Sequence, residues 1–261
     1  MLKNCATRLV TGGIRLRGGI MSKVEELKRI ISEARDICVF TGAGISVPSG
    51  IPDFRSASGL YNQDSGFNIR PEEIISHSFF MEHTDMFYEF YKSKMVYPEA
   101  EPNAAHKYFA LLEALGKHVS VVTQNIDGLH SAAGSSEVYE IHGSVLRNNC
   151  MSCGKFYDVD YVMSASGVPK CSCGGTVKPD VVLYEEPLDD RVVSGAVSAI
   201  ASADTLIIIG TSLVVYPAAS YVRYFRGKNL VVINLEPTQM DSIATLAIYD
   251  DVVNVVASLE K

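Results

Sequence analysis

The sequence predicts an α/β protein, in which a Rossmann-like, doubly wound parallel sheet carries an inserted small domain made of a zinc ribbon and a helical module. Apolar segments rich in β-branched residues alternate with segments of helical periodicity, the pattern of a mostly parallel sheet. Several of these segments end in glycine or polar residues, and ligands of open parallel sheets bind beyond such strand ends. Four cysteines lie close together, which indicates a metal-stabilised insertion.

A helix is expected from Ser22 to about Arg35, because Ser22 and Glu25 have the spacing of a capping box. Its apolar residues at helical spacing predict one buried face, made of Val24, Leu27, Ile30, Ile31 and Ala34. A buried strand over residues 37–40 follows and runs directly into Gly42-Ala43-Gly44. Glycines at this point let the backbone turn tightly and approach a pyrophosphate. The third glycine of the usual fingerprint is replaced by Val47, so this motif alone fits an ordinary tight turn equally well.

The segment after this turn departs from a plain nucleotide-binding fold. Pro48 and Pro52 stiffen a loop that would bring Asp53, Phe54 and Arg55 close to the expected phosphate site. Residues 56–70 are expected to form a long loop, which in a compact enzyme is often functional. The aromatic-rich residues 71–97 predict two short helices, with side chains that belong mainly to the core.

The chain then returns to the sheet. Asn103 is placed to cap a helix that runs to Gly116, and strands are predicted over residues 119–123 and 138–141. Polar residues follow both strands: Gln124, Asn125, Asp127 and His130 after the first, and His142 beside Gly143 after the second. Polar strand ends on one edge of a sheet predict a ligand site there. His130 is expected to satisfy backbone groups behind residues 125–127.

Two cysteine pairs predict a metal site: Cys150 with Cys153, and Cys171 with Cys173. Four thiolates complete a tetrahedral shell and leave no position for water, so we expect one structural zinc ion. The metal would hold a module with too little core to fold alone. Clustered cysteines also indicate a reducing compartment, and we expect the protein in the cytoplasm.

The C-terminal third supplies the rest of the predicted sheet. A strand over residues 181–184 is expected to re-enter the sheet, followed by a helix over 189–203 and a strand over 205–209. Pro217 would begin the next helix, residues 230–233 form a strand, and a last helix starts near Asp250. The predicted parts are therefore a Rossmann-like part of residues 21–55, 98–146 and 181–261, a helical insertion of 56–97 and a zinc ribbon of 147–180.

The composition argues against two kinds of partner, nucleic acids and membranes. The formal net charge of -7 argues against a nucleic-acid-binding surface, and no apolar run reaches the roughly 18 residues of a membrane span. Residues 1–20 carry basic but no acidic residues, and we expect them to be an extension without structure before a natural start at Met21. We expect a monomer.

Together, these motifs resemble the sirtuins of the bacterial type, which are NAD-dependent protein lysine deacylases. The resemblance rests on residues 42–46, 50–55, 123–130, 142–143, the four cysteines, 210–212 and 234–236, in this order. It covers the chain from about Met21 to the C-terminus. It implies NAD as co-substrate, one structural zinc ion, and acetyl-lysine proteins or peptides as substrates.

The resemblance also implies residue roles. His142 would be the general base and Asn125 would position the ribose or a water molecule. Asp127 would bind the nicotinamide amide, and the substrate peptide would pair as a β-strand with Val182, Leu183 and Tyr184. The residues expected to line NAD are Ala43, Gly44, Val47, Asp53, Phe54, Arg55, Gln124, Asn125, Ile126, Asp127, His142, Gly210, Thr211, Ser212, Asn234, Leu235, Glu236, Asp251 and Val252.

Two departures from the family pattern stand out. Glu185-Glu186 occupies a place where the family often has glycine followed by glutamate. Lys94, three residues after Tyr91, replaces the arginine of members that prefer acidic acyl groups. Lysine lacks the planar fork that binds a carboxylate, so we expect a preference for acetyl over succinyl. Two alternatives remain open: an NAD-dependent mono-ADP-ribosyltransferase on the same scaffold, and a non-catalytic NAD-sensing module.

Overall fold

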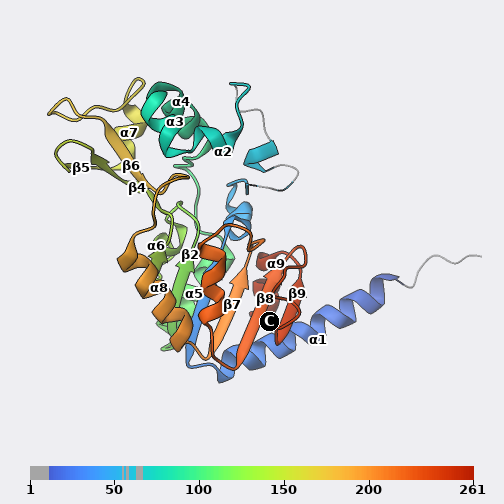
Figure 1. Cartoon of the computed structure of the whole chain (residues 1–261). Helices are drawn as coiled ribbons and strands as arrows, with labels where there is room; N and C mark the ends of the chain where they lie inside the picture. The colour runs from blue at the N-terminus through green and yellow to red at the C-terminus, as the bar shows by residue number, and fades with distance from the viewer. Residues whose placement is uncertain (1–11, 55, 57–58, 63–66) are drawn as a thin grey trace, which may run out of the picture.

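The computed structural model describes residues 12–54, 56, 59–62 and 67–261. The described chain forms a large lobe around a parallel sheet and a small lobe of helices and a second sheet (Figure 1). Residues 1–11 and Arg55 lie outside this description. Within the described residues, no helix is long and apolar enough to cross a membrane.

The large sheet has six parallel strands in the order β3-β2-β1-β7-β8-β9. Their bounds are β1 Asp36–Thr41, β2 His118–Thr123, β3 Glu137–Glu140, β7 Thr205–Ile209, β8 Asn229–Asn234 and β9 Leu246–Tyr249. Numbered along the chain, the six strands follow the order 3-2-1-4-5-6 of doubly wound dinucleotide-binding sheets, as predicted. The order reverses between β1 and β7, which opens a crevice at their carboxyl ends. The edge strand β9 was not predicted, because it is short and its residues alternate between buried and more exposed positions.

Helices cover both faces of this sheet (Figure 1). One face packs against α1 (Gly12–Glu33), α5 (Ala104–Ala114) and α9 (Val252–Leu259), and the other against α8 (Asp190–Ser202) and the 3-10 helix η4 (Ala218–Tyr224). Successive strand residues serve opposite faces, so Val39 of β1 belongs to the first core and Phe40 to the second. Asn103 caps α5 as predicted, with His106 completing a capping box. The short helix α6 (Leu129–Ala132) follows β2.

Helix α1 differs from its prediction at its start. It begins at Gly12, so Ser22 lies inside the helix and does not cap it. The helix therefore extends into the segment expected to be without structure, and its N-terminal part runs past the edge of the sheet at β9 (Figure 1). The predicted apolar face is confirmed: Val24, Leu27, Ile30, Ile31 and Ala34 are all buried.

The small lobe combines two insertions. The first has three helices where two were predicted, α2 (Pro71–Ile74), α3 (His77–Glu82) and α4 (Thr84–Lys94), preceded by the 3-10 turn η3 (Leu60–Asn62). The second is an antiparallel sheet β5-β4-β6 with helix α7 (Val159–Ser164). Its strands are β4 Gly143–Cys150, β5 Phe156–Tyr157 and β6 Val177–Val181. The aromatic side chains form the shared core as expected: Phe79, Phe80, Phe87, Tyr88, Phe90 and Tyr91.

The strand predicted over residues 181–184 does not join the large sheet. Val181 ends β6, which pairs with β4 in the small lobe, and residues 182–184 cross between the lobes. The prediction was wrong because an apolar run does not say which sheet a strand joins. At this crossing Gly143 has a φ of +76°, and a Cβ atom there would lie 1.9 Å from the carbonyl oxygen of Asp180. Only glycine fits, and the close approach fixes the neighbouring His142 between the lobes.

Candidate active site

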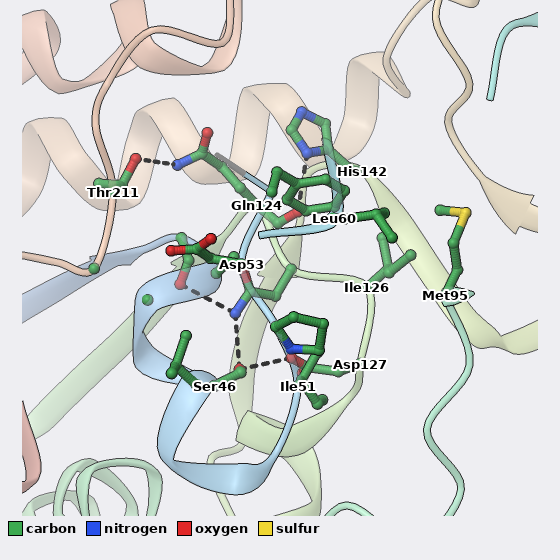
Figure 2. Close-up of a pocket in the computed structure, with 18 of the residues that line it drawn as sticks. Ser46, Ile51, Asp53, Leu60, Met95, Gln124, Ile126, Asp127, His142 and Thr211 are labelled. Atoms are coloured by element: carbon green, nitrogen blue, oxygen red, sulfur yellow. Dashed lines mark hydrogen bonds between the residues drawn. The ribbon is translucent and has the colours of Figure 1, made fainter. Parts of the chain in front are cut away.

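A cavity of about 1030 Å³ opens between the two lobes, at the carboxyl ends of β1, β2, β7 and β8. Every predicted cofactor-binding or substrate-binding residue lines it except Arg55, which lies outside the described residues. The fold thus brings these residues into one cavity, although they come from segments as distant as Ala43 and Val252. Figure 2 shows part of the lining, with Gln124, Asp127, His142 and Thr211 around one space.

The glycine turn after β1 packs against the end of β7. The Gly44 N–H donates to the carbonyl oxygen of Gly210 at 2.8 Å, and the Gly42 N–H donates to that of Ile209 at 3.1 Å. A Cβ atom on Gly44 would lie 2.6 Å from the Cα atom of Gly210. The ends of β1 and β7 thus need glycine because their backbones touch. This contact closes the floor of the crevice between these two strands.

A chain of hydrogen bonds holds the predicted amide and carboxylate in place (Figure 2). Asn125 donates from Nδ2 to the Ser46 hydroxyl at 3.0 Å and to the Gly42 carbonyl oxygen at 3.2 Å. The Ser46 hydroxyl donates to Asp127 at 2.7 Å, and the Leu129 N–H donates to the other carboxylate oxygen at 2.9 Å. Burial raises the pKa of Asp127, and these hydrogen bonds oppose the rise. Ser46 was not assigned a role from the sequence, although it lies in the motif that was quoted.

The imidazole of His142 is held by a contact with the backbone. Its Nδ1 lies 2.9 Å from the carbonyl oxygen of Gln124, which can only accept, so Nδ1 carries the proton. The Nε2 atom is then left as a proton acceptor in a residue that lines the cavity. Burial lowers the pKa of His142, and the hydrogen bond to Gln124 partly offsets this effect. A neutral imidazole with a free Nε2 suits general-base chemistry near neutral pH.

The ends of β2, β7 and β8 are joined by side chains that line the same cavity. Gln124 donates from Nε2 to the Thr211 hydroxyl at 3.1 Å. Asn234 accepts from the Thr211 N–H at 3.1 Å and donates to the Thr211 carbonyl oxygen at 2.8 Å. These residues were predicted as cofactor contacts, and the structure shows that they also order one another.

A buried polar chain lies behind this surface. The Thr41 hydroxyl donates to Thr123 at 2.8 Å, and Thr123 accepts the backbone N–H of Asn125 at 3.0 Å. His130 lies 3.1 Å from the Thr41 hydroxyl, and its ring packs at 4.8 Å from that of His106. The expectation for His130 was therefore wrong in detail, because its partner is a side chain and not backbone. Burial lowers the pKa of both histidines, that of His106 to about 4.

Residues 182–186 form the far wall of the cavity. The Val182 N–H donates to the His142 carbonyl oxygen at 3.0 Å, and Tyr184 exchanges backbone hydrogen bonds with Ile75 and His77. The Leu183 N–H donates to the Glu186 carboxylate at 2.9 Å. Among the hydrogen bonds of the described residues, none uses the carbonyl oxygen of Val182 or the backbone groups of Glu185. These groups remain available to an incoming extended peptide.

Apolar residues from the loop after β1 and from the small lobe complete the cavity and were missed. Ile51, Leu60, Met95, Val96 and Leu146 all line it, and Figure 2 shows Leu60, Ile126 and Met95 around the space beside His142. Their sequence carries no polar motif and no periodicity that separates a cavity wall from a core. Only the packing of the two insertions brings them to the site.

The four predicted cysteines meet in the small lobe. Their sulfur atoms all lie within 4.8 Å of one another, with three separations of 3.5, 3.6 and 3.5 Å. Tetrahedral zinc with Zn–S bonds of about 2.3 Å would place sulfur atoms about 3.8 Å apart, so the cluster fits this ion. Backbone N–H groups of Ser152 and Cys173 point at the sulfur atoms of Cys150 and Cys171, at 3.4 and 3.5 Å. The four cysteines are thus positioned to bind a structural zinc ion.

Comparisons with known proteins agree with this site. Residues 42–217 match the Sir2 family. A protein of Clostridium perfringens (strain 13 / Type A) named NAD-dependent protein deacetylase is 57% identical over 232 residues, covering 88% of this chain and 95% of that protein. A Staphylococcus aureus (strain NCTC 8325 / PS 47) protein with the same name is 43% identical over 236 residues, covering 90% and 97%.

Two solved structures share the fold and hold ligands. A histidine variant of Sir2 with deacetylated p53 peptide and 3'-O-acetyl ADP ribose has a TM-score of 0.82 and 38% identity, covering 91% of this chain and 97% of that one. Sir2 with p53 peptide and NAD+ has a TM-score of 0.77 and 40% identity, covering 90% and 96%. With its doubly wound sheet, its four-cysteine cluster and these matches, the chain belongs to the Sir2 family.

Proposed function

We propose that this protein removes acetyl groups from protein lysine side chains in an NAD-dependent reaction that yields nicotinamide and O-acetyl-ADP-ribose. One observation carries the proposal. The imidazole of His142 lies in the same cavity as Asp127 and the crossing segment Val182–Tyr184, with its Nε2 free to accept a proton. Two relatives named NAD-dependent protein deacetylase, each matched over most of its length, support the same reaction.

Each residue of the site has a role in this reaction that follows from its chemical groups. NAD would supply the ADP-ribose group. This group separates from nicotinamide and receives the acetyl group. Asp127, held by Ser46 and the Leu129 N–H, presents a fixed carboxylate that can accept from the nicotinamide amide. Asn125 is fixed by Gly42 and Ser46 through its Nδ2, so its Oδ1 is free to accept from a ribose hydroxyl or a water molecule. His142 then takes a proton from a ribose hydroxyl, which makes that oxygen nucleophilic.

The dinucleotide would lie along the carboxyl ends of the strands. Gly44 and Gly210 pack together at the floor of the crevice where the pyrophosphate would lie, and Thr211, Ser212 and Asn234 offer polar groups beside it. Leu235, Glu236, Asp251 and Val252 extend the same wall. Ala43, Val47, Asp53, Phe54 and Arg55 would cover the ligand from the loop after β1.

The zinc ion has a structural part in this proposal. Cys150, Cys153, Cys171 and Cys173 would hold it, and four thiolates leave no coordination position for a substrate. The ion would tie together the turns that flank β5 and β6. Unpaired thiols of this kind persist in a reducing compartment, so we place the protein in the cytoplasm. We also propose that the protein acts as a monomer and that it does not bind nucleic acid.

The decisive experiment mixes the protein with NAD and an acetyl-lysine peptide and follows the products by mass spectrometry. We expect deacetylated peptide, nicotinamide and O-acetyl-ADP-ribose in equal amounts, and none of them when NAD is omitted. Release of nicotinamide without acetyl-lysine, with ADP-ribose left on a protein, would instead indicate the mono-ADP-ribosyltransferase. Binding of NAD without turnover would indicate the sensing module.

A further inference from the structure

Two adjacent glutamates, Glu185 and Glu186, follow the crossing segment and have different surroundings. Glu186 is fully engaged: one carboxylate oxygen lies 2.9 Å from Nδ1 of His77, and the other accepts from Lys178 at 3.0 Å and from the Leu183 N–H. Glu186 therefore shapes the chain within the small lobe, and its charge is balanced by its neighbours.

Glu185 is exposed and only half engaged. Its Oε2 accepts from both the backbone N–H of Ser78, at 2.9 Å, and the Ser78 hydroxyl, at 2.6 Å. Among the hydrogen bonds of the described residues, none uses its other oxygen, Oε1. The side chain is thus held in place by α3 while it keeps a free, charged acceptor at the rim of the cavity, which Glu185 lines.

The backbone of Glu185 is unusual for its residue type. Its φ is +76°, a left-handed conformation that glycine adopts freely and that a side chain disfavours. A strained non-glycine residue beside a ligand cavity indicates a use for its side chain. Here the strained residue directly follows Tyr184 on the segment that faces an incoming peptide, and its own backbone groups are unused.

We propose that Glu185 selects substrates in which a lysine or arginine side chain lies beside the acetylated lysine. This inference rests on the proposed deacetylase function and adds to it a residue that reads the sequence around the modified lysine. A cation within reach would form a charge-assisted hydrogen bond with Oε1. The anchor on Ser78 lowers the entropy lost when that bond forms.

Other charged residues also line the cavity. Asp160 of α7 lines it and is exposed. Lys178 and His77 are paired with Glu186, and Lys94 is a positively charged residue of the same lining. Among the ion pairs of the described residues, none includes Glu185 or Asp160, so both carboxylates can attract a cationic substrate.

The test compares acetyl-lysine peptides that differ only in flanking residues, with arginine, glutamine or glutamate at each of the two positions on either side. At low ionic strength we expect kcat/KM to be about fivefold higher for the peptide with arginine at one flank than for the peptide with glutamate there. This factor corresponds to the stabilisation that an exposed pair of opposite charges provides. Glu185→Gln keeps an oxygen for Ser78 and should reduce this ratio about threefold. Salt at 0.5 M should reduce the parent ratio in the same way.

Two further variants and a control complete the experiment. Glu185→Gly removes the carboxylate but suits the left-handed backbone, so it should lose the same selectivity even if Glu185→Gln disturbs the turn. Ser78→Ala keeps the charge of Glu185 but removes the hydroxyl that anchors its carboxylate. This variant should therefore reduce the ratio of kcat/KM between the arginine and glutamate peptides only in part. Glu89→Gln removes an exposed charge on α4, away from the cavity, and should leave the ratio unchanged.

The outcomes separate the two proposals. A parent enzyme that deacetylates every peptide with equal efficiency, or a Glu185→Gln variant that keeps the full arginine preference, would overturn the role of Glu185 and leave the deacetylase function intact. A parent that consumes no NAD with any acetylated peptide would overturn the function itself.

Discussion

The Nδ1 atom of His142 lies 2.9 Å from the carbonyl oxygen of Gln124, and this contact decides which ring nitrogen can act as a base. Gln124 directly follows β2 and His142 lies two residues after the end of β3, so the sheet itself sets the distance. The same Gln124 donates from its side chain to Thr211 beyond β7. One residue thus connects the predicted base to the wall that would hold the dinucleotide.

Replacing His142 by alanine should abolish turnover and leave NAD binding largely intact. Removal of a general base costs about a hundredfold to ten-thousandfold in rate, whereas the groups assigned to the dinucleotide lie on other strands. Product formation by mass spectrometry and NAD affinity by calorimetry provide the two readouts. Equal loss of binding and turnover would instead assign His142 to cofactor binding, and full activity of the variant would remove it from the mechanism.

The rate should fall on the acid side as His142 becomes protonated. Because burial lowers the pKa of this imidazole, the active neutral form persists below the ordinary value of about 6.5. The pH profile of kcat/KM for NAD should therefore show an acid limb below pH 6.5. An acid limb at higher pH would mean that a different group controls the reaction, or that a bound charge reverses the effect of burial.

The buried pair His106 and His130 should make stability fall in acid. Both have a lowered pKa in the folded state, that of His106 to about 4, so the unfolded chain binds more protons below pH 6.5. Stability is then complete above about pH 6.5 and is lost progressively as the pH falls toward 4. For His106 alone, the loss between pH 7.5 and 5.5 is about 1.4 kcal/mol.

Urea unfolding at several pH values checks this effect. His106→Gln keeps a side chain suited to the capping box but cannot titrate, so its stability should depend less on pH by about 1 kcal/mol over that interval. Parallel curves for the parent and the variant would show that His106 is not the group responsible.

Removal of zinc should unfold the ribbon and not the large sheet. The four cysteines tie together turns around β5, a strand of two residues, while the large sheet has its own core. Cys171→Ala should lose bound zinc, expose residues 150–175 to protease and lower activity, because the ribbon also supplies Asp160 to the cavity. Cys38→Ala, which removes a buried thiol of β1, should keep the metal. A metal-free protein with an intact ribbon would contradict this account.

Matched acetylated and succinylated peptides test the acyl preference. Lys94 lines the cavity, whereas Tyr91 is buried among aromatic side chains and does not. A single ammonium group provides no planar fork for a carboxylate, so we expect a higher kcat/KM for the acetyl peptide. Lys94→Arg should raise the relative rate on the succinyl peptide. A parent that prefers succinyl would show that another group binds the acid.

Much of the site could be read from the sequence because its groups are local. Gly42, Gly44, Gln124, Asp127 and His142 lie within four residues of the ends of their strands, and parallel strands bring their carboxyl ends to one edge. The cysteine pairs likewise need only short spacings. Periodicity identified the buried face of α1, since a helix places those residues together without help from the rest of the chain.

Contacts between distant segments were decided only by the tertiary structure. The edge strand β9, the membership of β6 in the second sheet and the start of α1 depend on which neighbour a segment finds. The same holds for the partner of His130, for the apolar wall around Met95, and for the anchoring of Glu185 by Ser78. The sequence by itself thus determined the fold class, the zinc ligands and the polar side of the cavity, because these follow from local spacing. Packing between the lobes decided the apolar wall and the substrate side, because side chains far apart in the chain meet there only after folding.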